Sequence, residues 1–382
     1  MSGEVEWIEE VEGDFLLHKA VLNGMSSVPN GKEYLSRTEA GLKTTVMPMG
    51  TKVLTAERYG TSAWARTGKI TVLSPENEHK RYFLKCITGK GARALAEGEY
   101  HSAAAMTAAA PGLVPEPVGW GTYHAEGLEY FFYLGNYHDL DLAAAPEPGA
   151  FAARVAQFHS NGTSPNGMFG FQVPTTIGIM ERTVAWESSW AKSFARQLQD
   201  VIGFDDDTNG PWPEFRIAVN HLIEAVIPRL LGALQSDGRQ ITPALVHGDL
   251  WEHNVGIDME SGEIIIFDPG CTYAHNEMEF GTWRCSWAYH FNSPMYQRMY
   301  QRHIEPSEPV DEWDDRNRLY SIYPYLVDSA GHAGSVSRKV AYNDILYLCE
   351  KYAPSDDLEK YDPEKDLSVT KAYTPFVISQ LE

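Results

Sequence analysis

The sequence predicts an α+β fold of two lobes, in which a small antiparallel sheet with one main helix precedes a larger helical lobe. Short apolar runs separated by turn residues dominate between residues 51 and 134, whereas apolar residues at three- and four-residue spacing dominate after residue 136. We therefore expect a sheet-rich lobe over residues 46–134 and a helical lobe over residues 135–382. Residues 1–45, with one amphipathic helical stretch at 7–22, are expected to form an N-terminal extension.

The expected sheet comes from four apolar runs with turn residues between them. The runs at 69–73 and 82–87 flank a polar loop and predict a hairpin. Residues 91–110, rich in alanine and stopped by a Pro-Gly pair, predict the one helix of this lobe. The runs at 117–123 and 128–134 complete the sheet.

Helical spacing of the apolar residues predicts the elements of the larger lobe. A segment without this spacing, residues 245–268, interrupts the helices and concentrates polar residues. The charged tail at 355–366 is expected to be loosely held. The expected helices span residues 149–160, 186–201, 215–236, 277–291, 314–330 and 340–351.

The composition limits the partners of the protein. Lys and Arg total 31 against 52 Asp and Glu, so the formal net charge is -21. Because so acidic a surface repels nucleic acid and anionic membranes, we expect neither as a partner, and a nucleotide phosphate would need a few placed cations. Widely separated cysteines, no secretory signal and no long apolar run predict a reduced, cytoplasmic protein, which we expect to be a monomer or weak dimer.

Two neighbouring motifs carry the chemistry. Asp249 stands five residues before Asn254, and the apolar run 264–267 ends in Asp268. This order and spacing are typical of phosphoryl transfer in a protein-kinase-like fold, where H-x-D-L-x-x-x-N supplies a base and a metal ligand and a strand-end Asp supplies the second ligand. We expect Asp249 to be the catalytic base, and Asn254 and Asp268 to bind Mg²⁺. Each of the three taken singly could instead be a turn or cap residue, but their joint spacing favours the catalytic interpretation.

Lys85 lies inside an apolar run, where an unpaired ammonium is costly to bury. In a protein-kinase-like fold such a lysine pairs with ATP phosphates and with a glutamate of the following helix. We expect Glu99 to be that glutamate, with Glu97 as the alternative.

The remaining nucleotide contacts are expected from two backbone segments. A loop around Gly60 would lie over the phosphates, although a single glycine is few for a loop that must bring backbone N–H groups close to phosphate. The adenine of ATP would lie against the backbone near Tyr133 and Gly135, between the lobes.

The kind of acceptor is indicated by Trp251 and by the connection after Asp268. A protein kinase usually carries a lysine at the position after H-R-D-L and a long activation loop that ends in A-P-E, whereas here only residues 269–276 precede the next predicted helix. A short connection suits a small acceptor molecule rather than a docked peptide.

Taken together, the motifs resemble those of the fructosamine (ketosamine) kinases, relatives of aminoglycoside and choline kinases. The signatures H-G-D-L-W-x-x-N, F-D-P-A and Y-G-H-x-E of that family are similar to His247–Asn254, Phe267–Gly270 and Tyr273–Glu277. The loop around Gly60 lacks the Gly-Gly-Gly run of the family. The other departures are His253, Gly270 and Ala274, which stand where the family has a small residue, Ala and Gly.

The resemblance implies a ketoamine acceptor, namely a ribulosamine or fructosamine adduct on lysine or on a small amine. Its sugar 3-hydroxyl would attack ATP, and the unstable phosphorylated adduct would fall off and so repair the amine. Trp251 would stack on the acceptor, or else lie in the core behind the loop. His275 and Glu277 would reach the acceptor, although Glu277 could equally cap the next helix. The alternatives are an aminoglycoside, choline or another amino-alcohol as acceptor, and a non-catalytic nucleotide-binding protein, which the Gly-poor loop and the bulky His253 would favour.

Overall fold

The computed structural model describes residues 47–370 apart from residues 49, 61, 63, 126, 127 and 179. The expected N-terminal extension and its helical stretch at 7–22 lie outside the described residues, as do residues 371–382.

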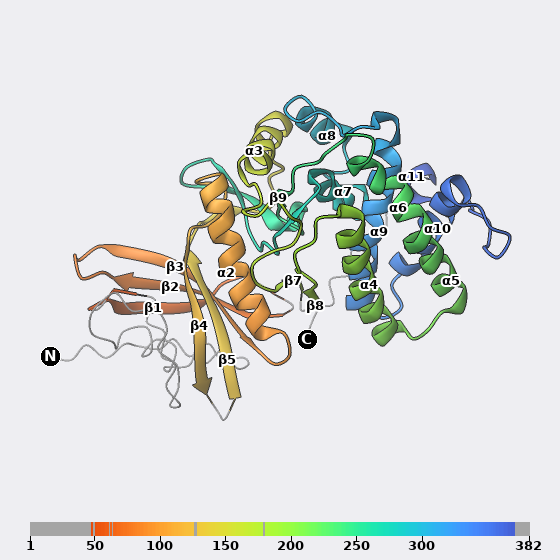
Figure 1. Cartoon of the computed structure of the whole chain (residues 1–382). Helices are drawn as coiled ribbons and strands as arrows, with labels where there is room; N and C mark the ends of the chain where they lie inside the picture. Colours follow the sequence, from red (N-terminus) through yellow and green to blue (C-terminus); the bar gives the residue numbers. More distant parts are fainter. Residues whose placement is uncertain are drawn as a thin grey trace.

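The smaller lobe is a five-stranded antiparallel sheet with one helix, α2, packed on it (Figure 1). Apolar side chains such as Ile70, Leu84 and Leu134 fill its core, because alternate residues of each strand face the same side. The expected hairpin, helix and following strand pair are all present, and the strand β1 was not expected. In sheet order the strands are β1 (Lys52–Arg58), β2 (Arg66–Leu73), β3 (His79–Thr88), β5 (Leu128–Asn136) and β4 (Pro117–Ala125), and α2 spans Ala92–Ala109.

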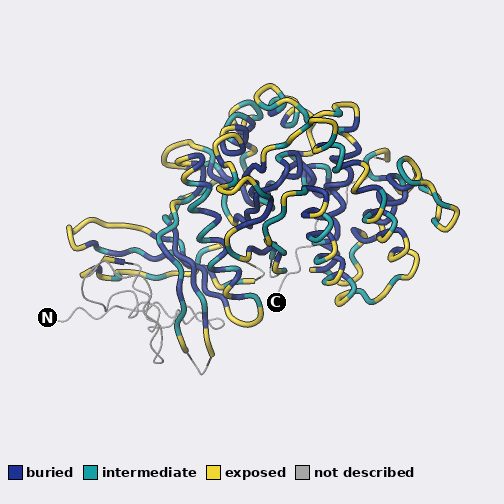
Figure 2. Tube along the Cα trace, viewed as in Figure 1, coloured by how far each residue is buried: buried dark blue, intermediate teal, exposed yellow. Residues whose placement is uncertain are grey.

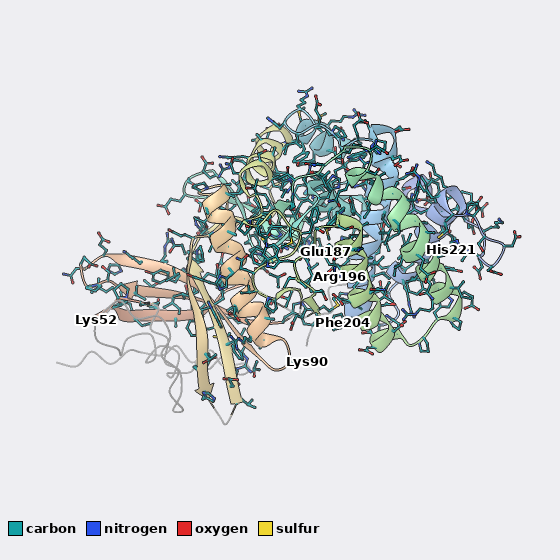
Figure 3. All side chains as sticks on the ribbon, in the orientation of Figure 1. Lys52, Lys90, Glu187, Arg196, Phe204 and His221 are labelled. Atoms are coloured by element: carbon teal, nitrogen blue, oxygen red, sulfur yellow. The ribbon has the colours of Figure 1, made fainter. Side chains whose placement is uncertain are left out.

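The larger lobe is built around α9 (Trp313–Gly331), which contacts α4 (Trp190–Asn209), α7 (Gly281–Arg284) and α10 (Ser337–Tyr352). The buried residues concentrate in the centre of this lobe (Figure 2). In the first half of α4, Arg196 pairs with Glu187 of the preceding loop, and both residues are labelled in Figure 3. The remaining helices are α3 (Pro148–Asn161), α5 (Pro213–His221), α6 (Ile227–Leu230), α8 (Pro294–Tyr300) and α11 (Leu367–Thr370).

The structure also has three small sheets, of which the sequence predicted only the run that contains β11. They matter because the segments with the predicted site residues follow directly from them. The sheets are β6–β10–β11 (Leu140–Asp141, Val255–Asp258 and Ile264–Ile266), β9–β12 (Ala244–Val246 and Thr272–Ala274) and β7–β8 (Thr175–Ile177 and Met180–Arg182).

The predicted helix at 277–291 is present only in its first half, as two short helical pieces. The chain forms a 3₁₀ turn, Asn276–Phe280, then the short α7, and is irregular beyond it. The physical reason is a competing acceptor, since the carboxylate of Glu252 accepts the backbone N–H groups of His290 and Phe291 at 2.7 and 2.8 Å.

The predicted helix at 215–236 is present in pieces. A π-helical turn, Leu222–Val226, separates α5 from α6, as expected where Pro228 has no N–H to donate to the preceding turn. Among the described residues, the stretch Pro213–Gln235 is long and apolar enough to cross a membrane by length and composition alone. Its apolar side chains contribute to the core of the larger lobe.

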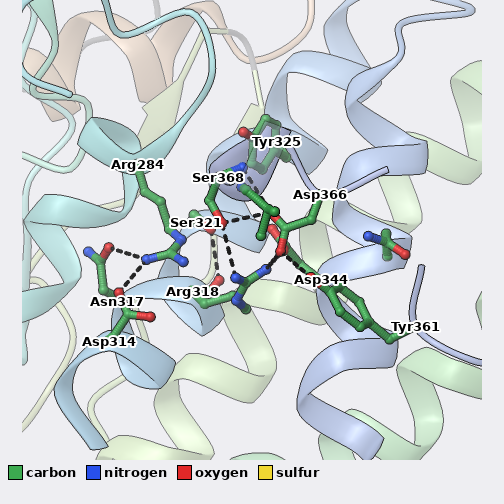
Figure 4. A network of polar contacts seen from close by, with 12 residues as sticks. Arg284, Asp314, Asn317, Arg318, Ser321, Tyr325, Asp344, Tyr361, Asp366 and Ser368 are labelled. Atoms are coloured by element: carbon green, nitrogen blue, oxygen red, sulfur yellow. Dashed lines mark hydrogen bonds and ion pairs between the residues drawn. The ribbon is translucent and has the colours of Figure 1, made fainter. Parts of the chain in front are cut away.

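The tail was expected to be loosely held up to residue 366, and this prediction is wrong at its end. Asp366 is buried and accepts hydrogen bonds from the hydroxyl of Tyr361 at 2.6 Å and from Arg318 at 2.9 Å (Figure 4). Arg318 also pairs with Asp344 of α10. Because Arg318 itself belongs to α9, these buried contacts hold the tail to the core of the larger lobe.

Candidate active site

Lys85, Glu99 and Asp268 meet at the junction of the two lobes. The Nζ atom of Lys85 in β3 lies 2.8 Å from Oε2 of Glu99 in α2 and 2.5 Å from Oδ1 of Asp268. Burial would lower the pKa of Lys85, but the two carboxylates outweigh burial and hold that pKa above its ordinary value. The expected pairing of Lys85 with Glu99 is therefore present, whereas the alternative, Glu97, contacts Arg93 on the exposed side of the helix.

The position of Asp268 is set by tight packing around the residues that follow it. Asp268 itself has a left-handed backbone with φ 57°, which is uncommon outside glycine. The backbone N–H of Cys271 donates to Oγ of Ser102 in α2 at 3.0 Å, and Oγ1 of Thr175 in β7 donates to the carbonyl of Cys271 at 3.0 Å. The helix that carries Glu99 is thereby bonded to the loop that carries Asp268.

Asp249 and Asn254 contact each other across the turn that joins them. The amide nitrogen of Asn254 donates to the backbone carbonyl of Asp249 at 2.8 Å and to its Oδ2 atom at 3.0 Å. Burial raises the pKa of Asp249 to about 7, although the hydrogen bond from Asn254 opposes the rise. A carboxyl group with this pKa can exchange a proton near neutral pH, as a general base must.

The backbone before Asp249 is held by Glu279, a residue that is not among the predicted site residues. Its carboxylate accepts the N–H groups of His247 at 2.6 Å and Gly248 at 3.1 Å, and it contacts the ring of His159 at 3.3 Å. Glu279 is 3% exposed. A carboxylate between the buried Met278 and Phe280 was a signal in the sequence, because a buried charge needs partners.

The residues expected to bind a metal suit a cation that arrives with a nucleotide. Since the amide nitrogen of Asn254 already donates to Asp249, its amide oxygen is the atom that a cation would use. Asp268 adds a carboxylate that is 43% exposed. Within the described residues no three His, Cys, Asp or Glu side chains cluster as a metal site, so further ligands would be phosphate oxygens and water, the usual situation for Mg²⁺.

The residues expected near the nucleotide lie on the sheet. Gly60 follows β1 with φ 73°, and residues 61 and 63 of its loop lie outside the described residues. Tyr133 pairs with Lys85 in the register of β3 and β5. Its hydroxyl lies over Gly135, since a Cβ atom on that glycine would be only 2.8 Å away. Burial raises the pKa of Tyr133, and the negative charge of Glu99 raises it further.

Three aromatic side chains that come after Asp249 in the sequence lie against one another. The ring of Trp251 stacks on that of His253, with centroids 4.3 Å apart and planes at 25°. Trp251 also packs against the core of the larger lobe. The ring of Tyr289, which is 51% exposed, meets His253 edge-on at 6.4 Å. We call Trp251, His253 and Tyr289 the aromatic cluster.

His275 and Glu277 do not lie where an acceptor could touch them, and this expectation is wrong. His275 is fully buried, and its two ring nitrogens bond the hydroxyls of Tyr320 and Ser307. Glu277 is 3% exposed and pairs with Arg316 at 2.8 Å. The physical reason is that both side chains hold the segment around Ser307 to α9, so that their polar atoms are occupied by partners inside the protein.

Comparisons with known proteins agree with this arrangement. A family model described as fructosamine kinase matches residues 53–343. The chloroplastic protein-ribulosamine 3-kinase of Oryza sativa subsp. indica is 28% identical over 250 residues, which cover 64% of this chain and 66%, just under two thirds, of that protein. The ketosamine-3-kinase of Mus musculus is 27% identical over 291 residues, which cover 71% of this chain and 88% of that protein.

Among solved structures, the protein named as a putative fructosamine-3-kinase of Thermobifida fusca is similar to this one with a TM-score of 0.61 at 18% identity. The likeness covers 79% of this chain and 95% of the other. It confirms the predicted fold, a small antiparallel sheet lobe with one main helix and a larger helical lobe, as protein-kinase-like.

Proposed function

The chain belongs to the fructosamine kinase family, and on that premise we propose that it is an ATP-dependent kinase that phosphorylates ketoamines. The acceptor is a ribulosamine or fructosamine group on lysine or on a small amine, and the phosphoryl group goes to the oxygen on carbon 3 of the sugar. Loss of the phosphorylated adduct then returns the free amine, so the activity repairs glycated amines.

One observation carries this proposal. Lys85 lies between Glu99 and Asp268, and a separate turn brings Asp249 together with Asn254. Phosphoryl transfer needs a cation for the phosphates, oxygen ligands for Mg²⁺ and a base for the attacking hydroxyl, and this set contains all of them.

Asp249 accepts the proton of the acceptor hydroxyl while the hydroxyl oxygen forms a bond to the γ-phosphorus of ATP. The bond from that phosphorus to the bridging oxygen breaks, and ADP leaves. Lys85 would bind phosphate oxygens, and Asn254 and Asp268 would hold Mg²⁺, which would neutralise phosphate charge.

The acceptor side of the site is proposed at the aromatic cluster. Because one part of Trp251 packs on the core and His253 stacks on its ring, an acceptor sugar or amine stem would meet the exposed rings of this cluster. A cationic amine is favoured by the net charge of -21 and by aromatic faces.

The test is ADP release from Mg·ATP with ribulose-lysine, fructose-lysine, choline and kanamycin as acceptors, and with Asp249→Asn as the inactive control. We expect turnover with the ketoamines, phosphate on carbon 3 by NMR, and release of free lysine. Turnover with choline or kanamycin alone would overturn the proposed acceptor. Tight Mg·ATP binding without ADP release from any acceptor would favour the non-catalytic alternative.

A further inference from the structure

Arg182, the last residue of β8, bonds both of the loops that carry the proposed catalytic groups. Its Nη1 atom donates to the carbonyl of Gly270 at 2.9 Å, and its Nη2 atom donates to the carbonyl of Gly248 at 3.3 Å. Gly248 immediately precedes Asp249, and Gly270 follows Asp268 by two residues. A single guanidinium group therefore connects the loop of the proposed base to the loop of the proposed metal ligand.

The charge of Arg182 is not matched by a carboxylate among the described residues. Its side chain is 3% exposed, its contacts are the two carbonyls and the ring of Tyr323 at 5.7 Å, and its Nε atom has no partner. The buried Arg316, Arg318 and Arg338 each pair with a carboxylate instead. Because an unmatched buried cation is costly, a purely structural link between two carbonyls would be served better by a neutral side chain.

The charge does act on the site itself. Burial raises the pKa of Asp249 and lowers that of His247, and the positive charge of Arg182, a smaller cause, acts to lower both values, so its field reaches the loop of the proposed base. The guanidinium thus supplies two directed hydrogen bonds and a positive charge at a place where the site gathers several carboxylates.

The two glycines make this approach possible. A Cβ atom on Gly248 would lie 2.8 Å from Nη1 of Arg182 and 2.5 Å from the carbonyl of Gly270. A Cβ atom on Gly270 would lie 2.1 Å from the carbonyl of Thr176 in β7. The β7–β8 hairpin and both loops are therefore in direct contact, and any movement of Arg182 is passed to the loops.

We propose that Arg182 is a positioning residue for phosphoryl transfer, which sets the spacing between the loop of Asp249 and Asn254 and the loop of Asp268. The inference rests on the proposed function, because it assigns the two loops to one reaction. Base and metal ligand must act on the same phosphoryl group, and a displacement of about 1 Å between such groups can lower the rate by roughly 10²-fold.

The test compares the variants Arg182→Met, Arg182→Lys and Arg338→Met. Arg338→Met is the control, because Arg338 is a buried arginine of α10 whose ion pairs with Asp205 and Asp206 lie outside the candidate site. For Arg182→Met we expect kcat to fall by roughly 10²-fold with KM for ATP within about threefold. Arg182→Lys should recover part of kcat, since one ammonium keeps the charge and can reach one carbonyl. Arg338→Met should lower the melting temperature but leave kcat per folded molecule unchanged.

Hydrogen exchange supplies a measurement that needs neither acceptor nor nucleotide. In Arg182→Met the backbone amides of residues 247–254 and 268–272 should exchange faster together, whereas Arg338→Met should leave both segments as they are. Faster exchange confined to the β7–β8 hairpin, or kcat within about twofold of wild type, would overturn the positioning role. Absence of turnover in the wild type would overturn the proposed function alone, because the exchange experiment would still decide whether Arg182 links the loops.

Discussion

Replacing Gly270 with alanine should destabilise the protein and slow phosphoryl transfer, although alanine is the residue that the related F-D-P-A signature carries at this position. Gly270 has no left-handed φ, so the effect of the substitution is one of space rather than of backbone conformation. The new methyl group would lie 2.1 Å from the carbonyl oxygen of Thr176, and Cβ atoms essentially never approach closer than 3.0 Å.

The size of the effect follows from that overlap. The carbonyl belongs to the backbone of β7, so it cannot turn aside as a flexible side chain could, and the loop or the strand must shift by roughly 0.9 Å. Overpacking of this kind costs about 1–3 kcal/mol. Loss of the hydrogen bond from Arg182 to the carbonyl of Gly270 adds about 1 kcal/mol. We therefore expect a loss of about 2–4 kcal/mol in the free energy of unfolding.

Urea unfolding measures this loss, and Gly203→Ala is the matched control. Gly203 lies exposed in α4 with nothing within 4 Å of the position of a Cβ atom, so alanine there should stabilise the protein by about 1 kcal/mol through helix propensity. The same chemical change thus has opposite signs at the two positions. In the folded fraction of Gly270→Ala, ADP release should fall because the loop of Asp268 has moved.

Two results would refute the reasoning. One is a Gly270→Ala protein within about 0.5 kcal/mol of wild type, which would mean that β7 does not press on this loop. The other is a destabilised variant with unchanged kcat and Mg²⁺ dependence, which would mean that the packing of the loop does not set the position of Asp268.

Four further outcomes are expected. Asp249→Asn should lower kcat by roughly 10²–10⁴-fold with ATP binding largely intact, and near-wild-type turnover would remove Asp249 from the role of base. Asp268→Asn should weaken nucleotide binding in the presence of Mg²⁺ but not in EDTA. Titration calorimetry under both conditions measures this, and equal weakening with and without Mg²⁺ would contradict the role of metal ligand. Lys85→Met should destabilise the fold by about 3–5 kcal/mol, because it leaves two carboxylates without their cation. Glu99→Gln should destabilise the fold less, because Lys85 stays paired with Asp268. Equal melting temperatures of the two variants would contradict this order. Burial lowers the pKa of His275 from 6.5 to about 4. As the pH falls from 6.5 to about 4, the unfolded chain therefore binds a proton at this residue that the folded chain does not bind. Acidification from pH 8 to pH 5 should therefore remove about 2 kcal/mol through this group, and a His275→Asn variant should lose less stability over that range, a difference that melting curves at both pH values would reveal.

Much of the fold and of the candidate site could be predicted from local patterns in the sequence. The hairpin, α2 and the order of the lobes follow from the periods of apolar residues and from turn residues, which act over a few positions. The pairing of Lys85 with Glu99 could be predicted because a lysine in an apolar strand must find an anion nearby. Spacing alone brought Asp249, Asn254 and Asp268 into one hypothesis, since five residues make one turn and a strand-end residue lies at the edge of a sheet.

Local patterns could not predict contacts between distant segments or the direction in which a polar side chain faces. Arg182 bonds carbonyls that lie 66 and 88 residues away, and no spacing rule connects them. His275 and Glu277 sit in a motif next to the site, yet packing against α9 turned both into the core. The sequence by itself determined which chemical groups were available and in what order. The tertiary structure alone decided which of them meet at the candidate site, because burial and partner choice depend on the whole packed fold.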